Sequence, residues 1–116
     1  MGDELKALQV ALRDFARERD WEQFHSPKNL AAALSVESAE LLEHFQWLTE
    51  EQSWRLAPDQ REAVGEEVAD VLLYLLQLAD KLQIDPVEAA HRKLRLNSDK
   101  YPVERARGRA DKYDKL

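Results

Sequence analysis

The chain has 116 residues, of which 44% are hydrophobic and 34% charged, and its formal net charge is −6. This length is typical of one domain, so we expect residues 1–116 to form a single domain. The acidic balance argues against a general nucleic-acid-binding protein, because such proteins present a basic face to phosphates. The absence of cysteine excludes disulfides and thiolate metal sites, so any metal must be held by oxygen or imidazole ligands.

No segment of the sequence is typical of a membrane or export signal. The longest apolar run, VLLYLLQLA at residues 71–79, is too short to cross a bilayer. Residues 1–10 lack the apolar stretch of a secretory signal. We therefore expect a soluble cytoplasmic protein with no membrane partner.

The first half of the chain predicts two helices. Residues 3–20 carry leucines and a phenylalanine at helical spacing on one side. A second helix is predicted from Ser26, a favourable capping residue, through Pro27 in the first turn to about Leu48. A polar connection follows.

The second half predicts two more helices and no strand. The third spans about residues 59–83, and the fourth begins at Asp85-Pro86 and runs to about Lys100. Residues 102–116 form a basic C-terminal arm. The expected fold class is therefore all-α, with a domain of the four-helix-bundle type.

The third predicted helix is apolar on nearly every side. A helix of this kind is buried nearly all round, which in so short a chain indicates a homo-oligomer. An overlong hydrophobic helix in a monomer is the alternative. One stripe consists of Val64, Val68, Val71, Leu75, Leu78 and Leu82, and the other sides carry Leu72, Leu73 and Leu76.

Two acidic pairs lie beside the apolar stripes of the second and third helices. Glu37 and Glu40 are spaced i, i+3, as are Glu67 and Asp70, so each pair shares a helix face. Glu40 lies as far before the expected end of the second helix as Glu67 lies after the expected start of the third. In an antiparallel hairpin the four carboxylates should therefore converge.

Converging carboxylates repel one another, and burial makes their ionisation still less favourable. Mg²⁺ or Mn²⁺ would remove this conflict, because both ions prefer oxygen ligands. A single Glu-x-x-Glu pair is usually only a solvated face, so the prediction depends on the two pairs together. A redox di-metal bundle needs two Glu-x-x-His motifs, and only Glu88 with His91 fits one.

The acidic pattern resembles the signature of the all-α nucleoside triphosphate pyrophosphohydrolases, the MazG-like superfamily. Residues 15–47, 66–82 and 93–102, together with Lys112 and Tyr113, look like the corresponding parts of the dCTP pyrophosphatases. The resemblance implies Mg²⁺-dependent hydrolysis of a (deoxy)nucleoside triphosphate, with dCTP or a modified dCTP favoured, to the monophosphate and pyrophosphate. It also implies a homotetramer built from dimers and a role in clearing unwanted nucleotides.

The resemblance further implies roles for individual residues. Glu37 and Glu40 would be catalytic, and the sequence does not decide which of them is the general base. Tryptophans at the positions of Trp21 and Trp47 would flank the base. The metal ligands would be Glu37, Glu40, Glu67 and Asp70. The substrate-binding residues would be Trp21, Phe24, His25, Asn29, Trp47, Lys93, Asn97, Lys100 and Tyr101.

One position departs from the pattern. Leu12 occupies the place where dCTP-specific relatives carry a histidine near the base, which favours a broader or modified-pyrimidine preference. The acidic motif alone also leaves dUTP or phosphoribosyl-ATP hydrolysis open. A non-catalytic helical oligomerisation module is the alternative from a different functional class.

Overall fold

The computed structural model describes residues 2–116, which divide into two compact units, residues 2–84 and 85–116. The ordered elements of both units are helices, and residues 2–116 contain no strand. The all-α prediction is confirmed. Within the same residues, no helix combines the length and the apolar character needed to span a membrane.

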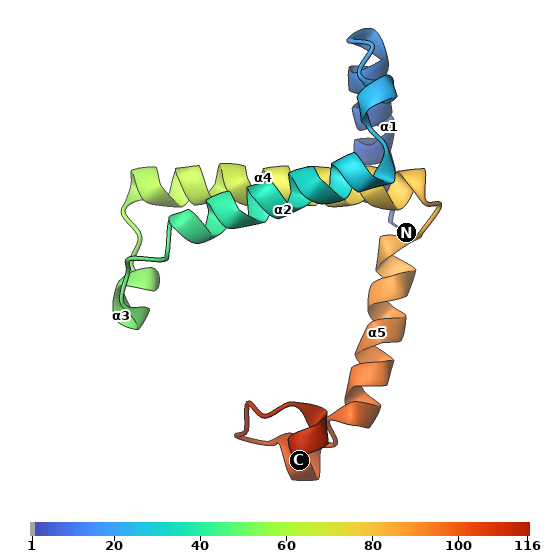
Figure 1. Ribbon diagram of the computed structural model, residues 1–116. Coiled ribbons are helices and arrows are strands. Elements are labelled where there is room, and N and C mark those ends of the chain that lie inside the picture. Colours follow the sequence, from blue (N-terminus) through green and yellow to red (C-terminus); the bar gives the residue numbers. More distant parts are fainter. Residues whose placement is uncertain (1) are drawn as a thin grey trace. The chain divides into compact units, whose positions relative to one another are not determined.

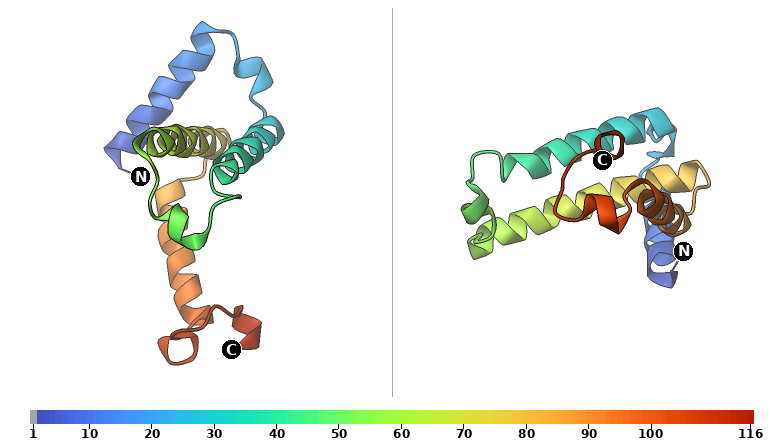
Figure 2. Two further views of the ribbon diagram at one scale, coloured as in Figure 1. Left: turned by 90° about the vertical axis from the view of Figure 1, so that its left-hand side faces the viewer. Right: turned by 90° about the horizontal axis from the view of Figure 1, so that it is seen from below.

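The first unit is built on a pair of long antiparallel helices. α2 (Pro27–Glu43) runs alongside α4 (Pro58–Lys81), and the connection between them carries the short α3 (Glu50–Ser53). α1 (Asp3–Glu18) crosses α4 at a steep angle (Figures 1 and 2). The short 3₁₀ turn η1 (Glu22–Phe24) leads from α1 toward α2.

The predicted start of α2 is confirmed, whereas its predicted end at Leu48 is wrong. The Ser26 hydroxyl accepts a hydrogen bond from the Asn29 amide at 3.2 Å, and Pro27 occupies the first turn. The helix ends at Glu43, where the regular bonding gives way to turns: His44 and Phe45 N–H each donate three residues back, to the Leu41 and Leu42 carbonyls.

The polar connection between α2 and α4 contains a helix that the sequence pattern did not predict. Thr49 and Gln52 form a capping box, in which each side chain accepts a hydrogen bond from the backbone amide of the other. This reciprocal pairing satisfies two amides that would otherwise lack partners, which explains why α3 begins at Glu50.

Two helices end in the same manner, with a residue in the left-handed region. Asp20 (φ 54°) follows α1, and Gln83 (φ 55°) follows α4. The next amide then folds back onto the helix: Trp21 N–H donates to the Ala16 carbonyl at 2.8 Å. This hydrogen bond closes the end of α1 and holds the backbone of Trp21 against it.

The core of the first unit is small. Leu30 of α2 and Leu76 of α4 are each only 1% exposed. Gln9 of α1 is also buried, and its side-chain nitrogen donates to the Leu76 carbonyl at 3.0 Å. A buried amide with a partner ties α1 to α4 without the cost of an unpaired polar group.

The second unit consists of α5 (Pro86–Lys100), α6 (Val103–Ala106) and a final 3₁₀ turn, η2 (Tyr113–Lys115). The Asp85 carboxylate caps α5 by accepting hydrogen bonds from two amides of its first turn. The Tyr113 ring packs edge-on against Tyr101, with 6.4 Å between centroids, and the Lys100 ammonium lies 5.0 Å from the Tyr113 ring centroid. These contacts hold the C-terminal turn against the end of α5.

Candidate functional site

Three carboxylates meet between α2 and α4. Glu37 comes from α2, and Glu67 and Asp70 come from α4; each offers one oxygen, and these oxygens lie within 4.8 Å of one another. The antiparallel pairing of the two helices produces this cluster, which contains three of the four carboxylates expected to converge; Glu40 is not among them.

Two oxygens of the acidic cluster are buried and unpaired. Glu37 Oε2 and Glu67 Oε2 are inaccessible to solvent and have no hydrogen-bond partner. Such atoms are rare in folded proteins, because an unpaired buried acceptor costs about 1–3 kcal/mol in general. These two oxygens therefore lack a partner that a bound ligand could supply.

Glu40 stands next to this cluster and changes its ionisation. The Glu40 carboxyl lies within hydrogen-bonding reach of Glu37; this contact, burial, and the negative charges of Glu40 and Asp70 raise the pKa of Glu37 from 4.5 to about 7. At pH 7 Glu37 thus keeps a proton about half of the time in the metal-free protein, whereas an ordinary glutamate has lost it.

The donor set fits a hard divalent cation. It supplies only carboxylate oxygens, which Mg²⁺ and Mn²⁺ prefer, and the unpaired oxygens of Glu37 and Glu67 are the atoms that such an ion would satisfy. A positive charge here would also favour the ionised form of Glu37, which its carboxylate neighbours oppose.

A cavity of about 270 Å³ adjoins the acidic cluster and shares Asp70 with it. Its walls come from α1, from the segment after α1, and from α4, and they are largely apolar and aromatic. The lining residues are Leu12, Phe15, Ala16, Trp21, His25, Asp70, Leu73, Tyr74 and Gln77.

The structure brings two of the predicted base-binding residues into this cavity. Trp21 lines it and packs edge-on against Phe15, with 5.7 Å between ring centroids. His25 lines it as well and is half-buried. Both side chains are therefore placed where a flat ligand beside Asp70 could contact them.

Three other predicted substrate residues of the first unit do not line the cavity. Phe24 is exposed, and its carbonyl accepts a hydrogen bond from the Asn29 side chain at 2.9 Å, so Asn29 steadies the turn before α2. Trp47 is 87% exposed and lies in the turns after α2, instead of on the helix where the sequence placed it.

The remaining predicted substrate residues belong to the second unit. Lys93, Asn97 and Lys100 lie on α5, and Tyr101 follows as its C-terminal cap, with its amide bonded to the Asn97 carbonyl at 2.8 Å. Their role toward a phosphorylated ligand stays a prediction.

Comparison with known proteins gives the family. The model of the MazG-like family matches residues 32–116, which include the whole acidic cluster. The chain belongs to the MazG-like family. The resemblance drawn from the sequence is confirmed.

Curated relatives of this MazG-like chain carry a more specific name. It is 46% identical over 107 residues to dCTP pyrophosphatase 1 of Bos taurus, and 45% identical over 107 residues to dCTP pyrophosphatase 1 of Homo sapiens. In both cases the match covers 89% of this chain, and the chain spans 62% of the length of the relative.

The fold has a solved counterpart of nearly the same extent. The crystal structure of a pyrophosphatase from Archaeoglobus fulgidus superposes with a TM-score of 0.82 at 43% sequence identity. The match covers 88% of this chain and 95% of that chain.

The sequence prediction missed several residues of the cavity in this MazG-like chain. Asp70, Tyr74 and Gln77 are spaced i, i+4, i+7, so they share a face of α4. Tyr74 and Gln77 also carry polar groups within the otherwise apolar run of residues 71–79. These two polar residues in an apolar run were the signal in the sequence that could have indicated a binding cavity. Leu12, whose position the resemblance placed near the base, lines the cavity, but the wall that it forms with Phe15 follows from a helix crossing that no local pattern encodes.

Proposed function

We propose that this protein is a Mg²⁺-dependent nucleoside triphosphate pyrophosphohydrolase. It would cleave a (deoxy)nucleoside triphosphate, with dCTP or a modified dCTP favoured, to the monophosphate and pyrophosphate. The observation that carries this proposal is the acidic cluster of Glu37, Glu67 and Asp70 adjoining an apolar cavity through Asp70. The names of the curated relatives and of the solved pyrophosphatase support it.

The metal would be held by Glu37, Glu40, Glu67 and Asp70. When bound, Mg²⁺ or Mn²⁺ supplies positive charge that neutralises phosphate oxygens and lowers the pKa of water. The chain supplies the proton acceptor: Glu37 or Glu40 would take the proton of the attacking water on a carboxylate oxygen.

The cavity would hold the base. Trp21 offers an aromatic face for stacking, and His25 offers a polar edge, while Phe24, Asn29 and Trp47 would act from the segments around it. Lys93, Asn97, Lys100 and Tyr101 of the second unit would bind the triphosphate and sugar, because ammonium and amide donors match phosphate and hydroxyl oxygens.

We also propose that the protein works as a homo-oligomer, as a tetramer of paired dimers, in the cytoplasm, where it removes unwanted nucleotides. Three apolar residues on one face of α4 are exposed in the single chain: Val68, Leu72 and Leu75. Covering them with a second copy would remove apolar surface from water.

A panel of canonical and modified dNTPs with Mg²⁺ tests the proposal. Release of pyrophosphate is the expected result; release of orthophosphate, or of nothing, contradicts it. Glu67→Gln should lower kcat at least about 100-fold, since it removes charge from the acidic cluster. Glu66→Gln is the matched control, because Glu66 is the exposed neighbour outside the cluster, and should keep activity.

The same panel separates the remaining alternatives. If dUTP or phosphoribosyl-ATP is the best substrate, the protein is still a pyrophosphohydrolase but acts on a different substrate. A non-catalytic helical module would release no pyrophosphate from any substrate, and millimolar Mg²⁺ would leave its melting temperature unchanged, because only binding to the native state raises that temperature.

A further inference from the structure

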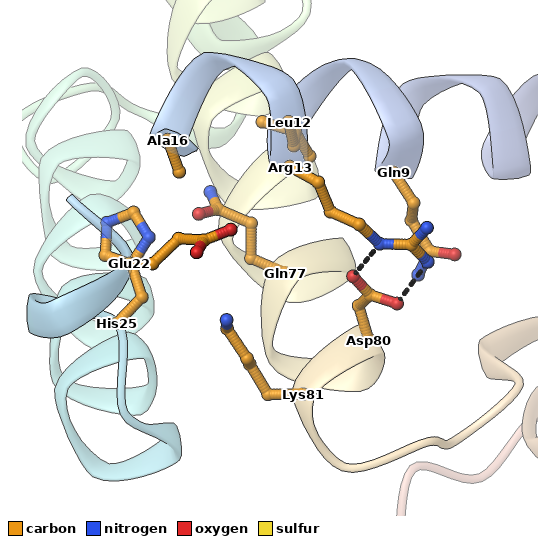
Figure 3. Close-up of a pocket in the computed structure, with 9 residues that line it drawn as sticks. All are labelled: Gln9, Leu12, Arg13, Ala16, Glu22, His25, Gln77, Asp80 and Lys81. Carbon is orange, nitrogen blue, oxygen red and sulfur yellow. Dashed lines mark hydrogen bonds and ion pairs between the residues drawn. The ribbon is translucent and has the colours of Figure 1, made fainter. Parts of the chain in front are cut away.

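Gln77 of α4 stands between two cavities. One is the 270 Å³ cavity beside Asp70, and the other is a small cavity of about 20 Å³, enough for about one water molecule. The two cavities share four lining residues: Leu12, Ala16, His25 and Gln77. Figure 3 shows the Gln77 side chain rising from α4 toward α1, with the Glu22 carboxylate and the His25 ring beside it.

The hydrogen bonding of Gln77 fixes which end of its amide is available. The side-chain nitrogen donates to the Leu73 carbonyl of the preceding turn, at 3.3 Å. A carbonyl can only accept, so the amide nitrogen must face Leu73 and Oε1 must point away from it. Oε1 accepts no hydrogen bond from residues 2–116, which leaves an acceptor free at the cavity wall.

The surroundings of this acceptor are mixed: Arg13 and Lys81 line the small cavity with Gln77, and the Arg13 guanidinium is held by Asp80. Glu22, whose carboxylate lines the small cavity, adds a second acceptor behind Gln77 (Figure 3). On the other side, Leu12, Phe15 and Leu73 offer no polar atom from their side chains to the large cavity. Because Oε1 accepts no hydrogen bond from residues 2–116 and one hydrogen of the amide nitrogen is held by Leu73, a ligand edge that donates a hydrogen bond is favoured at Gln77.

The position of Gln77 relative to the acidic cluster suits a nucleoside. Gln77 lies seven residues after Asp70 on the same helix, which is about 10 Å along its axis. This separation is comparable with the span of a nucleoside. A nucleotide with its phosphates at Asp70 would bring the far edge of its base to Gln77.

We propose that Gln77 determines base specificity, by accepting a hydrogen bond from an exocyclic amino group and so favouring cytosine over uracil. The inference rests on the proposed pyrophosphohydrolase function. The 4-amino group of cytosine donates to Oε1, whereas the 4-oxo group of uracil would face Oε1 with a second acceptor. A polar group left unpaired in this way lowers the affinity for the wrong base.

The test compares kcat/KM for dCTP and dUTP, which differ at that edge of the base. Gln77→Met keeps the size of the side chain but removes the amide, so the preference for dCTP should fall about tenfold or more. Gln77→Glu keeps an acceptor but loses the hydrogen bond to Leu73, and it should retain more of the preference for dCTP than Gln77→Met. Gln77→Leu repeats the loss with a different apolar side chain, in case the methionine variant does not fold. Gln46→Met is the control, because Gln46 is exposed and lines neither cavity.

The outcomes separate this inference from the proposed function. A wild-type protein that releases pyrophosphate from no nucleotide overturns both. An active wild-type protein whose dCTP-to-dUTP ratio is the same in Gln77→Met or Gln77→Leu overturns the role of Gln77 alone. A ratio that falls equally in Gln46→Met would also overturn it, since that change removes an amide that lines neither cavity.

Discussion

Arg13 and Asp80 join α1 to α4 through two parallel hydrogen bonds. Arg13 Nε donates to Asp80 Oδ2 at 2.7 Å, and Arg13 Nη2 donates to Asp80 Oδ1 at 2.6 Å (Figure 3). The Arg13 guanidinium holds the pKa of Asp80 below its usual value. Because Leu12 precedes Arg13 and lines the cavity, this pair also sets the position of a cavity wall.

Asp80→Asn should lower the melting temperature and raise KM more than it changes kcat, because it loosens α1 against α4. The lowered pKa of Asp80 determines how stability changes with pH. Ionised Asp80 stabilises the folded protein at neutral pH, and this stabilisation is lost as pH falls through the folded-state pKa of Asp80. Thermal melts between neutral and acidic pH would measure this loss.

The control for this change is Asp14→Asn. Asp14 pairs with Arg17 at 3.3 Å within α1, with both side chains mostly exposed, and such pairs contribute little. A double-mutant cycle of Arg13→Gln with Asp80→Asn should show coupling. Strictly additive effects on the melting temperature would mean that the Arg13–Asp80 pair does not hold the two helices together.

Glu37 should make the metal-free protein less stable as pH rises from about 4.5 to about 7. Its folded-state pKa is raised to about 7, so between those values the native state binds more protons than the unfolded chain. Stability falls with rising pH wherever the native state holds the extra proton. Melting in the presence of a chelator over this range is the measurement.

Glu37→Gln should flatten that pH dependence and raise the melting temperature of the metal-free protein at pH 7, since an amide cannot become a buried anion. It should also reduce the rise in melting temperature on adding Mg²⁺. Glu43→Gln, an exposed change at the end of α2, should leave the wild-type pH profile intact. An unchanged profile in Glu37→Gln would assign the titration to another group.

Leu76→Ala should destabilise the first unit by about 2–5 kcal/mol, as large-to-small changes at fully buried leucines do. Leu76 is 1% exposed, and its carbonyl also accepts the buried Gln9 amide, so a cavity here would disturb the contact between α1 and α4. Denaturant titration measures the loss. Leu42→Ala, at an exposed leucine of α2, should cost far less.

The acidic cluster could be predicted from the sequence because helix geometry decides it. The i, i+3 spacing places Glu67 and Asp70 on one face of α4, and an antiparallel neighbour brings Glu37 to the same height. The error in the end of α2 did disturb the predicted heights: counted from Leu48, Glu40 should lie opposite Glu67, whereas the structure groups Glu37 with Glu67 and Asp70.

Features that depend on tertiary contacts or side-chain capping could not be predicted in the same way. Trp47 was placed on a helix, but the regular helix stops at Glu43 and Trp47 lies in an exposed turn. The cavity wall of Leu12 and Phe15 depends on how α1 crosses α4, which the Arg13–Asp80 pair and the Gln9 hydrogen bond decide. These are contacts between residues far apart in the chain.

The exposed apolar face of α4 provides a test of self-association. Val68, Leu72 and Leu75 are spaced i, i+4, i+7 and stay exposed in the single chain, and Leu72 also borders an open groove with Leu8 of α1. A charge at the centre of a buried apolar contact is strongly unfavourable. Leu72→Glu should therefore shift the protein to a smaller species in size-exclusion chromatography with light scattering, while circular dichroism shows that its helices persist. Val36→Glu, at an exposed valine of α2, should keep the wild-type mass. If the wild-type protein is a monomer at every concentration tested, α4 is exposed in solution and the homo-oligomer proposal is wrong.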